Sequence, residues 1–151
     1  MMIEGLQTDL EIILRITLSF LLGGLIGWER ELHGGISAGI RTYGSIALGS
    51  CVFGVLSLSL VDADPSRIAA QIVTGIGFLG GGVIFRQGDY VSGLTTAATL
   101  WATSAVGLAV AFGFYFISFL TAVLIFLLLY LPKLPWWKKI SGKTNTPSRE
   151  T

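Results

Sequence analysis

The chain has 151 residues, of which 52% are hydrophobic, 13% are charged and 20 are glycine. An ordinary soluble domain carries about 25% charged residues, and a disordered chain combines low hydrophobicity with high net charge, so both classes are excluded. The formal net charge of +1 excludes a strongly basic nucleic-acid-binding protein. A single cysteine, Cys51, excludes a framework of internal disulfides. The composition therefore indicates an integral membrane protein embedded in a lipid bilayer.

Five apolar runs are long enough to cross a bilayer, because a helix needs about 20 apolar residues to span ~30 Å of hydrocarbon. They are residues 10–28, 42–61, 68–85, 94–111 and 114–131. We expect an all-α bundle of five transmembrane helices over residues 1–131. Pro132 and Pro135 end the last helix, and residues 132–151 read as a short basic tail.

The basic residues between the runs predict the orientation of the chain. If the carboxyl tail is cytoplasmic, eight basic residues lie inside and Arg67 alone lies outside, with Arg15 within the first span. The eight are Arg30, Arg41, Arg86, Lys133, Lys138, Lys139, Lys143 and Arg149. Because Lys and Arg are enriched in cytoplasmic loops, we expect the N-terminus outside and the C-terminus in the cytoplasm.

Glycine is concentrated in the first four spans and is absent from the fifth. Small residues let transmembrane helices approach closely, and Gly23 and Gly27 have the GxxxG spacing of such contacts. We therefore expect spans one to four to pack tightly and the bulky fifth span to face lipid at the periphery.

The third span is richer in glycine than packing requires. Its candidate packing or cavity residues are Gly75, Gly77, Gly80, Gly81 and Gly82. Each glycine costs a helix about 1 kcal/mol relative to alanine, so the stretch is a poor autonomous helix. Two interpretations stay open: an interface with close contacts on several faces, or a broken helix whose freed carbonyls line a polar cavity.

Ionisable residues at the span edges are candidates for function. Arg41 directly precedes an uncharged span and can reach into the bundle toward a carbonyl or a carboxylate such as Asp89. Arg15 lies one helical turn after Glu11, and the two can pair with each other at that spacing. The candidate functional charges are Glu29, Arg30, Glu31, Arg41, Asp64, Arg67 and Arg86.

The loop before the third span carries Asp62 and Asp64. Asp64 followed by Pro65 is typical of a helix start, with Asp64 as the N-cap. The alternative is that the two carboxylates hold a hydrated Mg²⁺, which requires only one or two carboxylates and water. Both aspartates are thus weak candidates for a metal site.

The fourth span has hydroxyls at helical spacing. Thr95 and Thr99 lie on one face with Thr96 beside them, and such hydroxyls bond back to the helix, bond to a neighbouring helix or line a polar pathway. The sequence has no metal cluster, no nucleophile paired with a base, no phosphate-binding loop and no dinucleotide fingerprint. We therefore expect a protein that is not an enzyme.

Four stretches in consistent order resemble the membrane domain of the MgtC/SapB family. They are GLIGWERE (24–31), GIRT (39–42), DPSRIAAQIVTGIGFLGGGVIFR (64–86) and VSGLTTAATLWATSAVG (91–107). Many members of the family have Ala at the position of Gly81, Asn at the position of Thr95 and Cys at the position of Ala102. Its MgtC members also continue into a cytoplasmic domain, so we expect a short form that lacks this domain.

The resemblance implies a multi-pass protein of the bacterial inner membrane, linked to growth in low magnesium, acid or intracellular stress, and to virulence. It implies a non-enzymatic regulator without a cofactor, with Mg²⁺ as a ligand or signal, acting through a membrane protein partner. By resemblance alone that partner is the F-type ATP synthase, and a homo-oligomer is left open. The alternative is a magnesium or proton transporter or channel that uses the glycine-rich third span.

Overall fold

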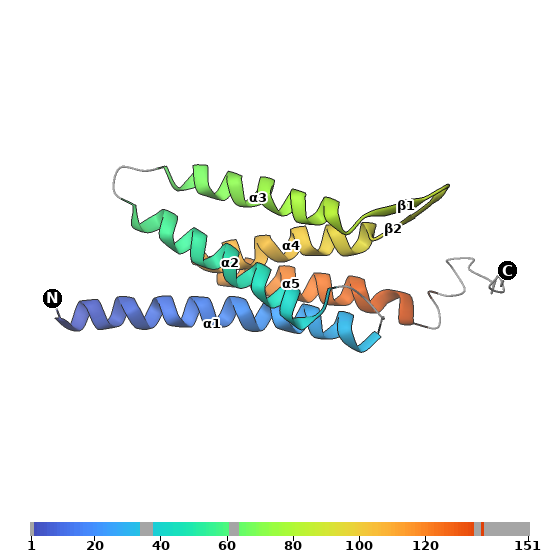
Figure 1. The fold of residues 1–151 in the computed structure, drawn as a ribbon. Helices are drawn as coiled ribbons and strands as arrows, with labels where there is room; N and C mark the ends of the chain where they lie inside the picture. Colours follow the sequence, from blue (N-terminus) through green and yellow to red (C-terminus); the bar gives the residue numbers. More distant parts are fainter. Residues whose placement is uncertain (1, 34–37, 61–63, 135–136, 138–151) are drawn as a thin grey trace.

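The computed structural model describes residues 2–33, 38–60, 64–134 and 137. Within them five helices run back and forth side by side (Figure 1), which confirms a mostly helical bundle. The helices are α1 (Met2–His33), α2 (Ile40–Ser59), α3 (Pro65–Gly82), α4 (Leu94–Ala111) and α5 (Tyr115–Tyr130), and a 3-10 turn, η1 (Leu131–Lys133), follows α5.

The helix boundaries follow local chemistry. α1 is longer than the predicted span 10–28 because good helix formers flank its apolar stretch. α3 begins at Pro65, and the side chain of Asp64 accepts a hydrogen bond from the backbone N–H of Ser66 at 2.9 Å. This confirms the predicted N-cap.

A two-stranded hairpin between α3 and α4 was not predicted. Strand β1 (Phe85–Gln87) pairs antiparallel with β2 (Tyr90–Ser92). Gly93, at φ +86°, then starts α4, and a Cβ at this position would collide with the carbonyl of Val83. Because three-residue strands are too short to show an alternating pattern, the sequence indicated only a polar connection here.

The packed core lies where α1 and α4 meet α2. A Cβ added at Gly23 would lie 2.6 Å from the carbonyl oxygen of Tyr43, and one at Gly27 would lie 2.7 Å from the carbonyl oxygen of Gly39. On α4, a Cβ at Gly107 would collide with the carbonyl of Ala47. These glycines therefore let the backbones of α1 and α4 approach α2 directly.

The glycines of α3 do not pack in this way, so the expectation of a tight third span was wrong. In α3 the buried residues are Ile76 and Gly80. A Cβ added at any of four other glycines would meet nothing within 4 Å; they are Gly75, Gly77, Gly81 and Gly82. α3 is also continuous, which excludes the broken helix. α5 is largely exposed, as predicted.

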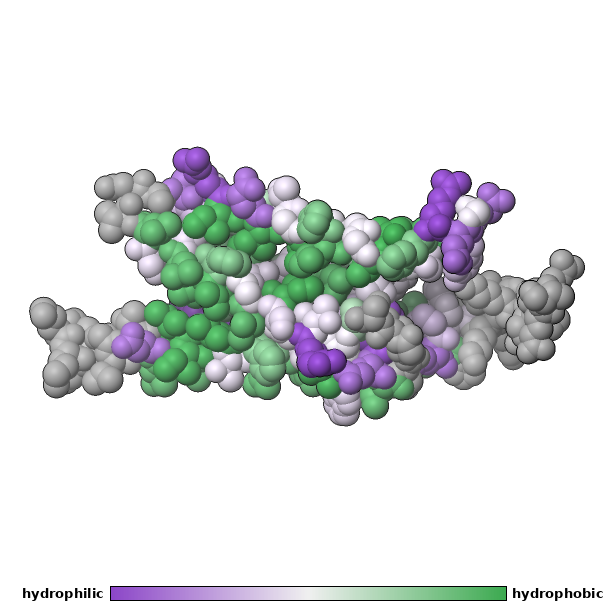
Figure 2. Space-filling view, viewed as in Figure 1, coloured by the Kyte–Doolittle hydropathy of each residue, from purple (hydrophilic) through white to green (hydrophobic). Residues whose placement is uncertain are grey.

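Among the described residues, four segments are long and apolar enough to cross a membrane. They are Asp9–Leu32, Ile40–Ser59, Leu94–Ala111 and Tyr115–Lys133. The predicted span 68–85 is helical as far as Gly82. α3 is not among these four segments, because it includes Pro65, Ser66 and Arg67 and ends before Val83, Ile84 and Phe85. Figure 2 shows hydrophobic residues along the visible faces of α2 and α3, with hydrophilic residues at the start of α3 and on the hairpin.

The contact at Gly107 predicts a matched pair of outcomes. Gly107→Ala should destabilise the protein by about 1–3 kcal/mol, because its methyl group has no room against the backbone of α2. Gly77→Ala should leave stability unchanged or raise it by up to ~1 kcal/mol, because that position is open. Reversible unfolding in mixed micelles measures both, and equal destabilisation by the two variants would contradict the packing described here.

Candidate functional site

Polar and charged side chains gather where α1 ends, α2 and α4 begin and α5 ends. We call this group the Arg30 cluster. Its members are Glu29, Arg30, Glu31, Tyr43, Thr96, Thr99 and Lys133. The cluster thus joins residues from four helix ends that are distant in the sequence.

The carboxylate of Glu29 is buried, with 4% of the side chain exposed, and it forms an ion pair with Nζ of Lys133. Lys133 is 25% exposed, and its Nζ also lies 5.2 Å from the ring centroid of Tyr130. Because a buried charge is tolerated only when it is paired, this contact holds the end of α5 against α1.

Arg30 connects α1 to α4. Its Nη2 donates a hydrogen bond to Oγ1 of Thr96 at 2.8 Å. Its Nε is buried and has no hydrogen-bond partner among the described residues. The guanidinium group is therefore fixed on one side and retains an unused donor on the other.

Glu31 caps the start of α2 from the end of α1. Its Oε2 accepts a hydrogen bond from the backbone N–H of Ile40 at 3.0 Å, whereas the N-cap residue, Gly39, has no side chain to do so. A carboxylate at this position satisfies a free N–H and interacts favourably with the helix dipole.

The hydroxyls of α4 are satisfied inside the protein. Oγ1 of Thr99 lies 2.6 Å from the hydroxyl of Tyr43 and also donates to the carbonyl of Thr95 at 2.9 Å. Thr103 donates to the carbonyl of Thr99 at 2.7 Å. Thr95 itself is exposed. Of the alternatives that the sequence left open, these hydroxyls bond back to α4 and across to α2.

The remaining candidate charges lie outside the cluster. The side chain of Arg41 is exposed and has no hydrogen bond or ion pair with another described residue, so it does not make the contact with a carbonyl or with Asp89 that its position in the sequence allowed. Arg67 is exposed in the first turn of α3, at the other end of the bundle. Arg86 is exposed on the hairpin, where its Nε donates to the carbonyl of Gly88 at 3.0 Å.

Asp64 acts as a helix cap at the opposite end of the bundle. The hydrogen bonds from Ser66 hold its pKa below the usual value, and the charge of Arg67 adds to this effect. Asp62 lies outside the described residues, so the predicted Mg²⁺ site of Asp62 and Asp64 stays a prediction. Within the described part of the chain, no group of three or more His, Cys, Asp or Glu residues is placed to hold a metal ion.

Arg15 closes the same end of the bundle. Its Nη2 donates to Glu11 at 2.5 Å, which confirms the predicted pair one turn apart. Its Nη1 donates to the carbonyl of Ala111 at 2.5 Å, at the last residue of α4. The residue therefore stabilises a helix end.

Two cluster members were missed at the level of sequence. Tyr43 stands in an uncharged span, and the rule that a buried tyrosine hydroxyl requires a partner would have identified it. Lys133 was assigned to the tail, and nothing local in the sequence links it to Glu29, which is 104 positions away.

The model of the MgtC family matches residues 16–134, which include most of α1 and all of α2 to α5. The chain belongs to the MgtC family. This MgtC family protein, with four helices able to cross a bilayer among its described residues, is a multi-pass membrane protein. No solved structure matches it.

Three relatives illustrate the similarity. This MgtC family protein is 57% identical over 91 residues to "Protein MgtC" of Brucella abortus (strain 2308). It is 42% identical over 128 residues to "Putative magnesium transporter YhiD" of Escherichia coli (strain K12). It is 39% identical over 138 residues to "Protein SapB" of Bacillus subtilis (strain 168). The matches cover 59%, 79% and 85% of this chain but only 37%, 59% and 58% of those proteins.

The ion pair predicts a stability change. Lys133→Met should destabilise the protein by about 1–3 kcal/mol, because it leaves the buried carboxylate of Glu29 without this cation. The lower part of that range reflects the partial exposure of Lys133. Arg41→Met removes an exposed cation and should change stability by less than ~0.5 kcal/mol.

A double variant separates the ion pair from general packing. Glu29→Gln combined with Lys133→Met removes both charges, so its destabilisation should be smaller than the sum of the two single variants. Denaturant titration in micelles measures all four proteins. Strict additivity would mean that the two side chains do not interact.

Proposed function

We propose that this protein is a non-enzymatic regulator of the bacterial inner membrane that acts through contact with another membrane protein. Its role is in magnesium homeostasis or in acid or intracellular stress. The proposed orientation has the N-terminus outside and the C-terminus, with the Arg30 cluster, on the cytoplasmic side. In this orientation the cluster faces the side on which cellular partners and magnesium are available.

The observation that carries this proposal is the geometry of Arg30. Thr96 holds one nitrogen of the guanidinium group, while the buried Nε has no partner among the described residues. A buried donor without an acceptor is costly, and arginine pairs most strongly with carboxylates. At the half-buried guanidinium group of Arg30, a carboxylate or carbonyl of a partner protein supplies the acceptor that the described residues do not provide.

The pairing of the other polar groups supports regulation over transport. A path for a hydrated cation requires polar groups that face water. Here Thr99 and Thr103 bond to the backbone and to Tyr43. Glu29 is paired with Lys133. These contacts hold the helices together rather than present oxygen atoms to an ion.

Transport of magnesium or protons is the second candidate. The relative from Escherichia coli carries the name "Putative magnesium transporter YhiD" and is 42% identical over 79% of this chain. A transporter would use the glycine-rich α3, whose open faces leave room for movement. The two candidates differ in whether the purified protein alone moves an ion.

Growth and flux test the proposal together. In a strain that requires the protein at limiting magnesium or low pH, Arg30→Gln should abolish most of the growth that the unaltered protein restores. Arg41→Gln, which alters an exposed arginine, should retain it. Both variants must reach the membrane in equal amounts, as immunoblotting checks. Normal growth with Arg30→Gln would remove Arg30 from the site.

Vesicles that contain only the purified protein should show no Mg²⁺ or proton flux above that of protein-free vesicles. A fluorescent indicator inside the vesicles measures the flux, and an added ionophore gives the positive control. Saturable flux would overturn regulation as the only function and would favour transport.

A further inference from the structure

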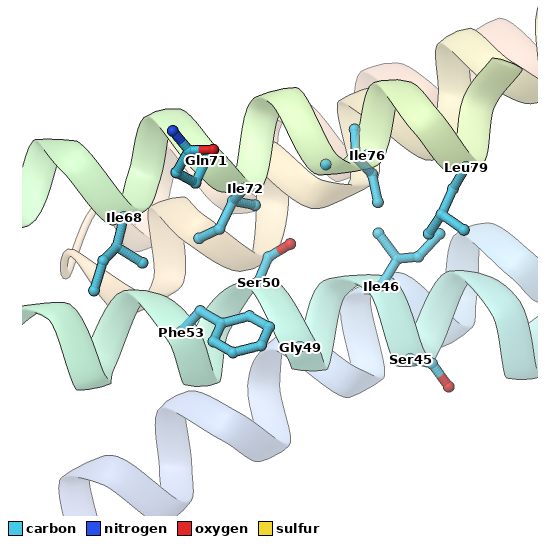
Figure 3. A pocket seen from close by; sticks show the side chains of 11 residues that line it. Ser45, Ile46, Gly49, Ser50, Phe53, Ile68, Gln71, Ile72, Ile76 and Leu79 are labelled. Carbon is cyan, nitrogen blue, oxygen red and sulfur yellow. The ribbon is translucent and has the colours of Figure 1, made fainter.

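An apolar groove runs between α2 and α3 and opens toward the side of the bundle (Figure 3). Its volume is about 650 Å³. Gly49 of α2 and Gly75 of α3 line it, and a Cβ added at either position would meet nothing within 4 Å. Ile72 and Leu79 form its apolar wall on α3. The described residues therefore leave this groove unfilled.

Two polar side chains in the groove have no partner within the described part of the chain. Ser50 is 4% exposed, and Figure 3 shows its hydroxyl oxygen directed into the groove toward α3. It lies ten residues after the start of α2, about 15 Å along the helix, and so near the middle of the hydrocarbon. Gln71 also lines the groove, but it is exposed, and its amide has no hydrogen bond with another described residue. Unpaired groups at this depth are costly.

The face of α3 beside the groove is also uncovered. Phe78 is 85% exposed and lies about 60° around the helix from Gly75. The sequence from Ile68 to Phe85 carries no charge, so two identical copies of this face would not repel each other. An uncharged and uncovered face of this kind can pack against an identical face in the membrane.

We propose that the α2–α3 groove is a homodimer interface within the membrane, with α3 of a second copy seated in it. Two copies inserted in the same orientation are related by a two-fold axis along the membrane normal, which places their α3 helices parallel. Phe78 of each copy then enters the groove of the other. The two Gln71 amides meet across the axis, and an amide is both donor and acceptor, so it pairs with its own copy.

A lipid chain fits the groove less well than a second copy. An acyl chain fills apolar volume, but it carries no hydrogen-bonding group for the amide of Gln71. A helix of a second copy supplies both apolar side chains and a polar group, and the open glycines allow its backbone to approach closely. The dimer therefore fills the groove and provides Gln71 with a partner.

Energy transfer between labelled full-length chains tests the interface. The chains are placed in vesicles of phosphatidylethanolamine and phosphatidylglycerol and diluted with lipid. The unaltered protein should dimerise, and Gly75→Leu, which fills the groove, should weaken the dimer at least tenfold. Gly77→Leu is the matched control, because this position is equally open but does not line the groove; its dimer should be unchanged.

Gln71→Leu gives a second test if Gly75→Leu does not fold. It keeps the apolar lining and removes the amide, so it should weaken the dimer several-fold while helix content by circular dichroism stays constant. Three results would overturn the proposal: a monomer at every dilution, equal weakening by Gly77→Leu, or a monomer that retains one lipid in native mass spectrometry and loses it in Gly75→Leu. Association only with a different membrane protein would also overturn it.

Discussion

Close approach of α1 and α4 to the backbone of α2 is the constraint on which the remaining structure depends. In lipid, helices gain nothing from hiding apolar surface from one another, so their association relies on contact between backbones and small residues. Gly23, Gly27 and Gly107 supply that contact, and a single methyl group at any of them would meet backbone atoms. With the three helices at this separation, Arg30 reaches Thr96 and Tyr43 reaches Thr99.

Most polar groups at the helix ends are paired within the protein. Glu29 is paired with Lys133, Glu31 caps α2 and Arg15 binds the end of α4. Exceptions among the described residues include Nε of Arg15, Nε of Arg30 and the hydroxyl of Ser50. Arg30 and Ser50 lie at the two places where we propose contacts with other proteins, at the end of the bundle and in the α2–α3 groove.

The sequence predicted those features that depend on neighbours along the chain. Apolar length located the five helices, and the Asp64–Pro65 pair located the cap of α3. The sequence did not predict the Glu29–Lys133 ion pair, because it joins α1 to the end of α5. It also misjudged α3, since a glycine permits close packing but does not show whether a neighbouring helix is present. In α1 such a neighbour lies at Gly23, whereas no described residue lies close to Gly77 of α3.

Amide hydrogen exchange tests this division most directly, with the protein held as a dilute monomer in detergent micelles. Local opening is easiest where few apolar contacts are buried. We predict that amides of residues 75–82 in α3, where Ile76 and Gly80 are the buried residues, exchange at least tenfold faster than those of residues 100–110 in α4. Equal rates, or slower exchange in α3, would contradict a packed α1–α2–α4 unit that carries a loosely attached third helix.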